Sequence, residues 1–125
     1  MDDGSSQWLA QAKKDLGTAK YLHNGKRHEE SAFFCQQSVE KSLKSLVLSR
    51  DHELIKTHDL VFLAKRVSLP SEFEQTCKEL TLIYVHVRYP DAVVNIKDLN
   101  KKSKRYLISA EGVLKWVRAQ LSAKA

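Results

Sequence analysis

Arg88 and Tyr89 place a guanidinium and a phenol side by side, directly before Pro90. The proline cannot donate a hydrogen bond to a helix and restricts the residue before it, so we expect a helix to end here. A helix end would hold both side chains on a fixed backbone. The guanidinium can bind two oxygens of a phosphate at once, and the ring can stack on a base. This pair therefore predicts a binding site for a phosphate or a nucleotide.

Other residues with suitable chemistry lie nearby or in neighbouring predicted helices. Tyr84 is four residues before Arg88 and shares its helix face, whereas His86 points to roughly the opposite side and suits packing or the surface. His58 follows Thr57, which is able to cap a helix. A structural role in orienting that turn is the first interpretation of His58, and catalysis is the second.

A helix predicted over residues 28–49 carries four polar residues on one arc, at spacings of three and four: Gln37, Glu40, Lys41 and Lys44. Glu40 and Lys44 form a favourable pair on a helix surface, worth about 0.3–0.5 kcal/mol, which is the structural interpretation. The functional interpretation is the polar wall of a groove, in which Gln37 and the two lysines reach a nucleotide.

Asp15 interrupts the apolar stripe of the first predicted helix, between Ala12 and Ala19. A carboxylate in that position must be paired or lie at the edge of the bundle, because burying it alone is costly. We expect a salt bridge or a helix-end contact that fixes helix packing, with a chemical role as the alternative.

Neither the cysteines nor the histidines are spaced as metal ligands. Cys35 and Cys77 have no close-spaced partner, and the five histidines include no His-x-x-x-His pair. We therefore expect no metal and no other cofactor. Both cysteines fall on apolar sides of predicted helices, as expected for buried free thiols in the reducing cytoplasm. The acidic start of the chain is unlike a signal peptide, and no apolar run reaches the roughly 18 residues of a membrane span.

The positive charge is confined to the end of the chain. Residues 1–94 carry thirteen acids and thirteen Lys or Arg, so the whole net charge of +6 lies in residues 95–125. Half of the basic residues there form one short segment, Lys101, Lys102, Lys104 and Arg105. A confined basic surface is typical of proteins that bind phosphates or other anionic partners. A solvated, lysine-rich helix face is the alternative.

Apolar periodicity predicts an all-α fold, with no sustained alternation of period two. The predicted helices cover about residues 7–23, 28–49, 60–67, 71–88 and 100–122, and Thr57-His58-Asp59 is expected to cap the third. Four long helices with short loops favour an up-and-down four-helix bundle, in which the additional short third helix fills one connection. We expect residues 1–6 to be a disordered lead-in and residues 7–125 to form a single domain.

Four motifs along the chain resemble the HEPN domain family (higher eukaryotes and prokaryotes nucleotide-binding). They are Trp8-Leu9-x-x-Ala12-x-x-Asp15-Leu16-x-x-Ala19, Gln36-Gln37-x-x-Glu40-Lys41-x-x-Lys44, Thr57-His58-Asp59-Leu60 and Tyr84-x-x-x-Arg88-Tyr89-Pro90-Asp91. The resemblance covers nearly the whole chain, from Trp8 to about Leu121, and is closest to the small stand-alone prokaryotic members.

The resemblance implies a helical bundle that commonly forms a homodimer, often beside a minimal nucleotidyltransferase in a toxin–antitoxin or related system. Many members carry an Arg-x(4–6)-His motif and cleave RNA without a metal, while others bind nucleotides or RNA without catalysis. Arg88 matches the arginine of that motif. Relatives with the Arg-Tyr-Pro-Asp stretch can place a histidine where this chain has Val93, and valine cannot transfer a proton.

The first hypothesis is therefore a non-catalytic HEPN module that binds a nucleotide or RNA. The residues expected at its binding site are Arg88, Tyr89, Tyr84, Gln37, Lys41, Lys44 and His58. The basic segment of residues 101–105 would extend this positive surface, an inference from charge alone.

Two alternatives remain. The first is a metal-independent ribonuclease that uses Arg88, with His58 supplying the missing imidazole from another element. The second is a protein-interaction module, chiefly a helper of a nearby nucleotidyltransferase, in which Tyr89 and Trp116 would anchor the interface.

Overall fold

The chain forms helices in the segments where apolar periodicity predicts them. A computed structural model of the chain describes residues 3–92 and 96–124. Within them it contains α1 (Ser5–Asn24), α2 (His28–Asp51), α3 (Leu60–Val67), the short 3-10 turn η1 (Ser71–Phe73), α4 (Glu74–Arg88) and α5 (Leu99–Lys124). The all-α prediction is confirmed, and each predicted helix is present.

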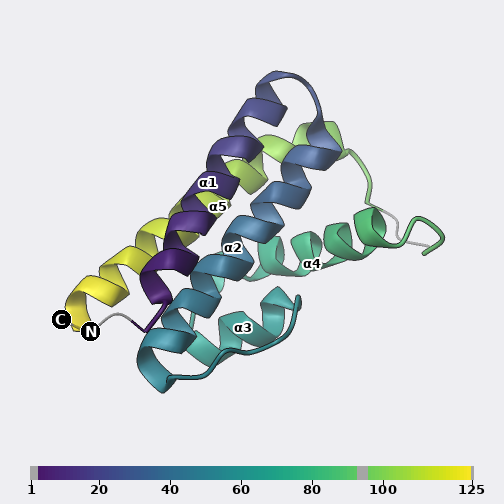
Figure 1. Cartoon of the computed structure of the whole chain (residues 1–125). Coiled ribbons are helices and arrows are strands. Elements are labelled where there is room, and N and C mark those ends of the chain that lie inside the picture. Colours follow the sequence, from purple (N-terminus) through teal and green to yellow (C-terminus); the bar gives the residue numbers. More distant parts are fainter. Residues whose placement is uncertain (1–2, 93–95, 125) are drawn as a thin grey trace.

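The long helices pack around α2. Helices α1 and α2 run antiparallel along their whole length, α5 lies beside them, and α4 crosses α2 obliquely (Figure 1). The short α3 fills the space between α2 and α4. The arrangement confirms a helical bundle with an additional short helix, in which α2 is buried on most of its sides.

Three serines of α2, spaced seven residues apart, bind α1 closely. The hydroxyls of Ser31, Ser38 and Ser45 donate hydrogen bonds to backbone carbonyls of α1 at 2.8, 2.7 and 2.9 Å. The accepting residues Ala19, Ala12 and Ser5 are also seven apart, in reverse order. Small side chains let the two backbones approach, and the hydroxyls are satisfied by the neighbouring helix. This pattern fixes the register of the antiparallel pair.

Helix α1 begins at Ser5, two residues earlier than predicted. The predicted disordered lead-in of residues 1–6 is therefore wrong for Ser5 and Ser6, which form the first turn of the helix. The Asp3 carboxylate accepts a hydrogen bond from the backbone N–H of Ser5 at 3.0 Å and so satisfies one free donor of that turn.

Both cysteines are free and buried, as predicted. Burial raises the pKa of the Cys35 thiol to about 12, and burial also raises that of Cys77 to about 12. Both thiols are therefore protonated at neutral pH and pack as small apolar groups. Among the described helices, none has the length and apolar character to cross a bilayer.

Candidate functional site

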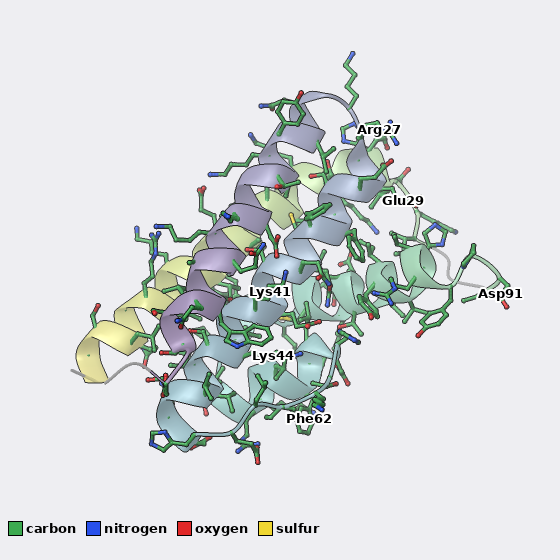
Figure 2. The ribbon with its side chains drawn as sticks, in the orientation of Figure 1. Arg27, Glu29, Lys41, Lys44, Phe62 and Asp91 are labelled. Carbon is green, nitrogen blue, oxygen red and sulfur yellow. The ribbon has the colours of Figure 1, made fainter. Side chains whose placement is uncertain are left out.

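Helix α4 ends at Arg88, as the following proline predicted. The backbone N–H of Tyr89 still donates to the carbonyl of Val85 at 2.9 Å, and the N–H of Ala92 donates to the carbonyl of Tyr89 at 2.9 Å. The chain therefore turns sharply, and Asp91 projects away from the helices (Figure 2). Arg88 and Tyr89 are both exposed on this end of α4, and Tyr89 is 55% exposed.

Four side chains from three parts of the chain form a stack at this end of α4. The Arg88 guanidinium lies over the Tyr84 ring, 5.5 Å from its centre. The rings of His58 and Phe33 both stack on the Tyr84 ring, with 4.3 Å and 6.1 Å between ring centres. Tyr84 is only 5% exposed, and burial raises the pKa of its phenol while the Arg88 cation lowers it. Tyr84 therefore supports Arg88 and His58, and the two exposed side chains are left to meet a ligand.

A capped helix start positions His58. The Asp59 carboxylate accepts from the backbone N–H groups of Val61 and Phe62, at 2.9 and 3.3 Å. The backbone N–H of Leu60 donates to the Thr81 hydroxyl on α4 at 3.1 Å. Within the predicted cap Thr57-His58-Asp59, it is therefore Asp59 that caps α3, and the Leu60 bond joins the start of this helix to α4. His58 is consequently held against α4, on a segment between α2 and α3.

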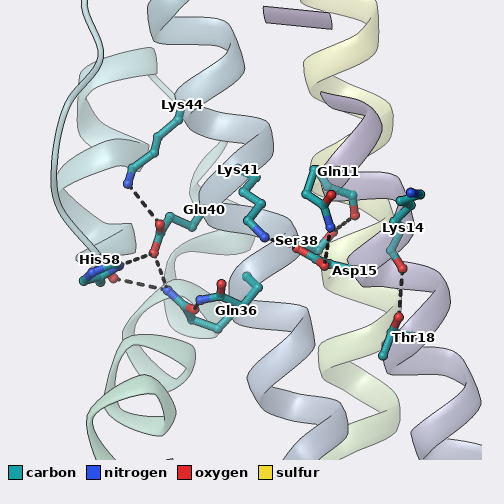
Figure 3. Close-up of polar contacts among 12 residues, drawn as sticks. Gln11, Lys14, Asp15, Thr18, Gln36, Ser38, Glu40, Lys41, Lys44 and His58 are labelled. Carbon is teal, nitrogen blue, oxygen red and sulfur yellow. Dashed lines mark hydrogen bonds and ion pairs between the residues drawn. The ribbon is translucent and has the colours of Figure 1, made fainter. Parts of the chain in front are cut away.

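Glu40 is the centre of a buried polar network. Its carboxylate accepts from Lys44 Nζ, Gln36 Nε2 and His58 Nδ1, each at 2.9 Å (Figure 3). The amide of Gln37 in turn donates to Gln36 at 2.7 Å. The Glu40 and Lys44 side chains are 5% and 7% exposed, so the expectation of a surface pair was wrong. The segment carrying His58 contacts Gln36 and Glu40 and so contributes to the burial of this carboxylate.

The bond to Glu40 selects one form of the His58 ring. A carboxylate only accepts hydrogen bonds, so Nδ1 must carry the hydrogen, and a neutral ring then keeps its lone pair on Nε2. The His58 side chain is 53% exposed. The Arg88 stack thus includes an oriented imidazole whose second nitrogen has no hydrogen-bond partner among the described residues.

Asp15 is paired with Lys41 across the α1–α2 interface. Lys41 Nζ lies 2.6 Å from the Asp15 carboxylate, which also accepts from the Gln11 amide at 3.1 Å (Figure 3). The predicted salt bridge of Asp15 is confirmed. Lys41 and Lys44 lie near one another along α2, and each is neutralised by a carboxylate of the same chain (Figure 2). In this state neither lysine is an isolated cation.

The basic segment of α5 lies on another side of α4. Lys102 and Arg105 pair with Glu79 at 3.6 and 3.0 Å, and the Tyr106 hydroxyl donates to the same carboxylate at 2.7 Å. Glu79 is five residues before Tyr84 and therefore lies about 140° away around the helix. Lys101 and Lys104 are exposed and make no ion pair within the described part of the chain. The basic segment and the Arg88 stack are separate surfaces.

Sequence reasoning did not assign Phe33 or Gln36 to the site. Gln36 is four residues before Glu40 on one face of α2, which was a usable signal, but Phe33 gave none beyond its apolar character. Val93, which stands at the expected histidine position, lies outside the described residues. Across residues 3–92 and 96–124, no three His, Cys, Asp or Glu side chains group in a way that could hold a metal ion.

Comparisons with known proteins agree with the fold and the motifs. The HEPN domain family matches residues 5–120. The structure of ST0689, an archaeal HEPN homologue, is 27% identical with a TM-score of 0.76, and the match covers 93% of this chain and 96% of that one. The structure of TT1696 from Thermus thermophilus is 24% identical with a TM-score of 0.80, and the match covers 94% and 98%. That second likeness concerns the fold alone.

No curated protein matches this sequence. The family match spans nearly the entire chain and includes all of its helices except the last residues of α5. The chain belongs to the HEPN domain family.

Proposed function

We propose that this protein is a non-catalytic HEPN module that binds RNA or a nucleotide at the exposed end of α4. The observation that carries the proposal is the Arg88 guanidinium, which is exposed, held over the Tyr84 ring and without an ion pair in the described part of the chain. A cation that its own fold orients but does not neutralise is suited to a phosphate. Tyr89, the exposed neighbouring ring, is suited to stack on a base.

The remaining site residues would act mostly through position. His58 has an exposed ring edge, and both His58 and Arg88 pack on the Tyr84 ring. Gln37, Lys41 and Lys44 belong to the polar face of α2, where their bonds to neighbouring side chains keep the wall of the site in place. The direct contacts to phosphate are assigned to Arg88.

His58 also favours a second candidate, a metal-independent ribonuclease. Its Nε2 atom accepts no hydrogen bond in the part of the chain that the structure describes, its ring is oriented by Glu40, and both it and Arg88 pack on the Tyr84 ring. A neutral imidazole is able to take the proton of a ribose 2′-hydroxyl as that oxygen attacks phosphorus and the 5′-oxygen leaves with a proton from water. Arg88 would stabilise the charge on the phosphate.

The assembly and the setting are proposed from the family. We place the protein in the cytoplasm as a homodimer, working with a minimal nucleotidyltransferase in a toxin–antitoxin-like system. Sedimentation of the purified protein tests the dimer, and the identity of the neighbouring gene tests the partner.

A fluorescence-anisotropy titration with labelled single-stranded RNA, at low and at moderate salt, tests the function. We expect binding that weakens steeply with salt, because Arg88 would displace counterions from phosphate, and RNA that stays intact on a gel afterwards. No binding at either salt concentration would contradict the proposal. Cut RNA would favour the ribonuclease, and His58→Ala should then stop the cleavage while binding remains.

A further inference from the structure

A groove runs between α1 and α5, on a part of the surface that the Arg88 site does not use. One hollow of about 500 Å³ and a second of about 340 Å³ adjoin there and share Lys20 and Glu111 in their lining. Helices α1 and α5 lie side by side along this seam (Figure 1). The edges of three core leucines, Leu16, Leu107 and Leu114, contribute to its lining, and each is at most 7% exposed.

Gly17 keeps the middle of this groove open. Glycine within a helix costs stability relative to alanine, so its presence calls for a reason. A Cβ atom at Gly17 would meet nothing within 4 Å, whereas one at Gly112 would come within 2.9 Å of the Phe73 ring. The fold therefore requires the glycine at position 112 but not the one at position 17. Close approach of a second backbone at Gly17 would supply that reason.

The walls of the groove are positively charged, and an ion pair lies at its midpoint. Lys13, Lys115 and Arg118 are exposed along the larger hollow and make no ion pair within the described residues. Between the helices, Lys20 Nζ lies 2.5 Å from the Glu111 carboxylate. The hydrogen bond from Lys20 and its charge lower the pKa of Glu111, which therefore stays ionised at neutral pH.

These features distinguish among the occupants that a groove of this size could take. An RNA strand would set its phosphate backbone against leucine side chains, which offer it no hydrogen bond. A second copy of this groove would set the same cations against one another. A helix with an apolar stripe and acidic flanks would cover the leucines and pair with the basic walls. Ile108, which is 62% exposed at the smaller hollow, would extend the apolar contact.

We propose that the α1–α5 groove binds an acidic amphipathic helix of a partner protein. Its apolar stripe lies on Leu16, Leu107 and Leu114 and passes closest to α1 at Gly17. Its flanking carboxylates pair with the cations of the walls. This site is independent of RNA binding at Arg88.

The probe is a synthetic amphipathic helix with a leucine stripe and glutamate flanks, labelled and titrated with the whole protein by fluorescence anisotropy. Two control peptides have the same leucine stripe with lysine flanks, or the same composition in scrambled order. We expect the acidic helix to bind at least tenfold more tightly than either control. Equal binding of the three peptides would overturn the proposal.

Two variants at one position test the location. Gly17→Trp fills the groove and should weaken binding of the acidic helix at least tenfold, whereas Gly17→Ala adds one methyl group at the point of closest approach and should weaken binding by a smaller factor. If Gly17→Trp fails to fold by circular dichroism, the double variant Lys115→Glu/Arg118→Glu replaces it and should weaken binding to the same degree. Unchanged affinity in the folded blocking variant would overturn the proposal.

Two further outcomes would assign the groove to another occupant. If Gly17→Trp weakens RNA binding while Arg88→Ala does not, the groove holds nucleic acid. If wild-type protein sediments as a dimer and Gly17→Trp as a monomer, the occupant is a second copy. Either result would overturn the partner-helix proposal, and unchanged RNA binding in Gly17→Trp separates this test from that of the Arg88 site.

Discussion

Replacing Glu40 by alanine is expected to lower the free energy of unfolding by about 3–5 kcal/mol. The change leaves the Lys44 ammonium, whose side chain is 7% exposed, without its carboxylate partner in a dry setting. It also removes the acceptor for the Gln36 amide and the His58 ring. An unpaired buried charge costs far more than a lost surface pair, which is why the effect should be large. Urea unfolding followed by circular dichroism measures it.

The pair Glu74 and Lys78 on α4 is a matched control. It has the same residue types, order and spacing, but its side chains are 58% and 55% exposed. Glu74→Ala should therefore cost no more than about 1 kcal/mol. The double variant Glu40→Ala/Lys44→Met should recover most of the loss, because it removes the orphaned charge together with its partner. Equal costs for Glu40→Ala and Glu74→Ala would contradict a buried network around Glu40.

Arg88→Ala is expected to weaken RNA binding by about 10–100-fold, the equivalent of about 1.5–3 kcal/mol for a charge-assisted hydrogen bond. The side chain is exposed and lies over the Tyr84 ring, so its removal should leave the unfolding midpoint nearly unchanged. Arg88→Lys should fall in between, since it keeps the charge and loses the planar fork. Anisotropy titrations of the three proteins at one salt concentration measure these differences.

Arg118→Ala controls for the loss of one positive charge. Arg118 is also exposed and makes no ion pair among the residues described, but it lies in the α1–α5 groove. Its removal should change RNA affinity by less than about threefold, through the small change in overall charge. Equal losses for Arg88→Ala and Arg118→Ala would mean that RNA is held by general positive charge and not by the α4 end.

The sequence predicted features whose causes are local. Pro90 marked the end of α4, and Thr57-His58-Asp59 marked the start of α3, because short local signals decide each boundary. The pairing of Asp15 was predictable as well, since a carboxylate within an apolar stripe requires a partner.

Features that depend on distant segments were not predictable. The spacing of Glu40 and Lys44 is that of an ordinary surface pair, but His58 lies against Glu40 and Trp8 lies against Lys44, and the pair is buried. The stack of Arg88, Tyr84 and His58 joins residues whose separation along the chain gives no hint of contact. The basic segment was expected to extend the Arg88 surface, but Glu79 attracts it to another side of α4.

An NMR titration of the isotopically labelled protein with a short single-stranded RNA locates the binding surface most directly. We expect the largest changes in the amide and side-chain signals at His58, Arg88 and Tyr89, and none in the α1–α5 groove. Changes confined to the basic segment of residues 101–105, with the Arg88 side-chain signal unmoved, would contradict this expectation.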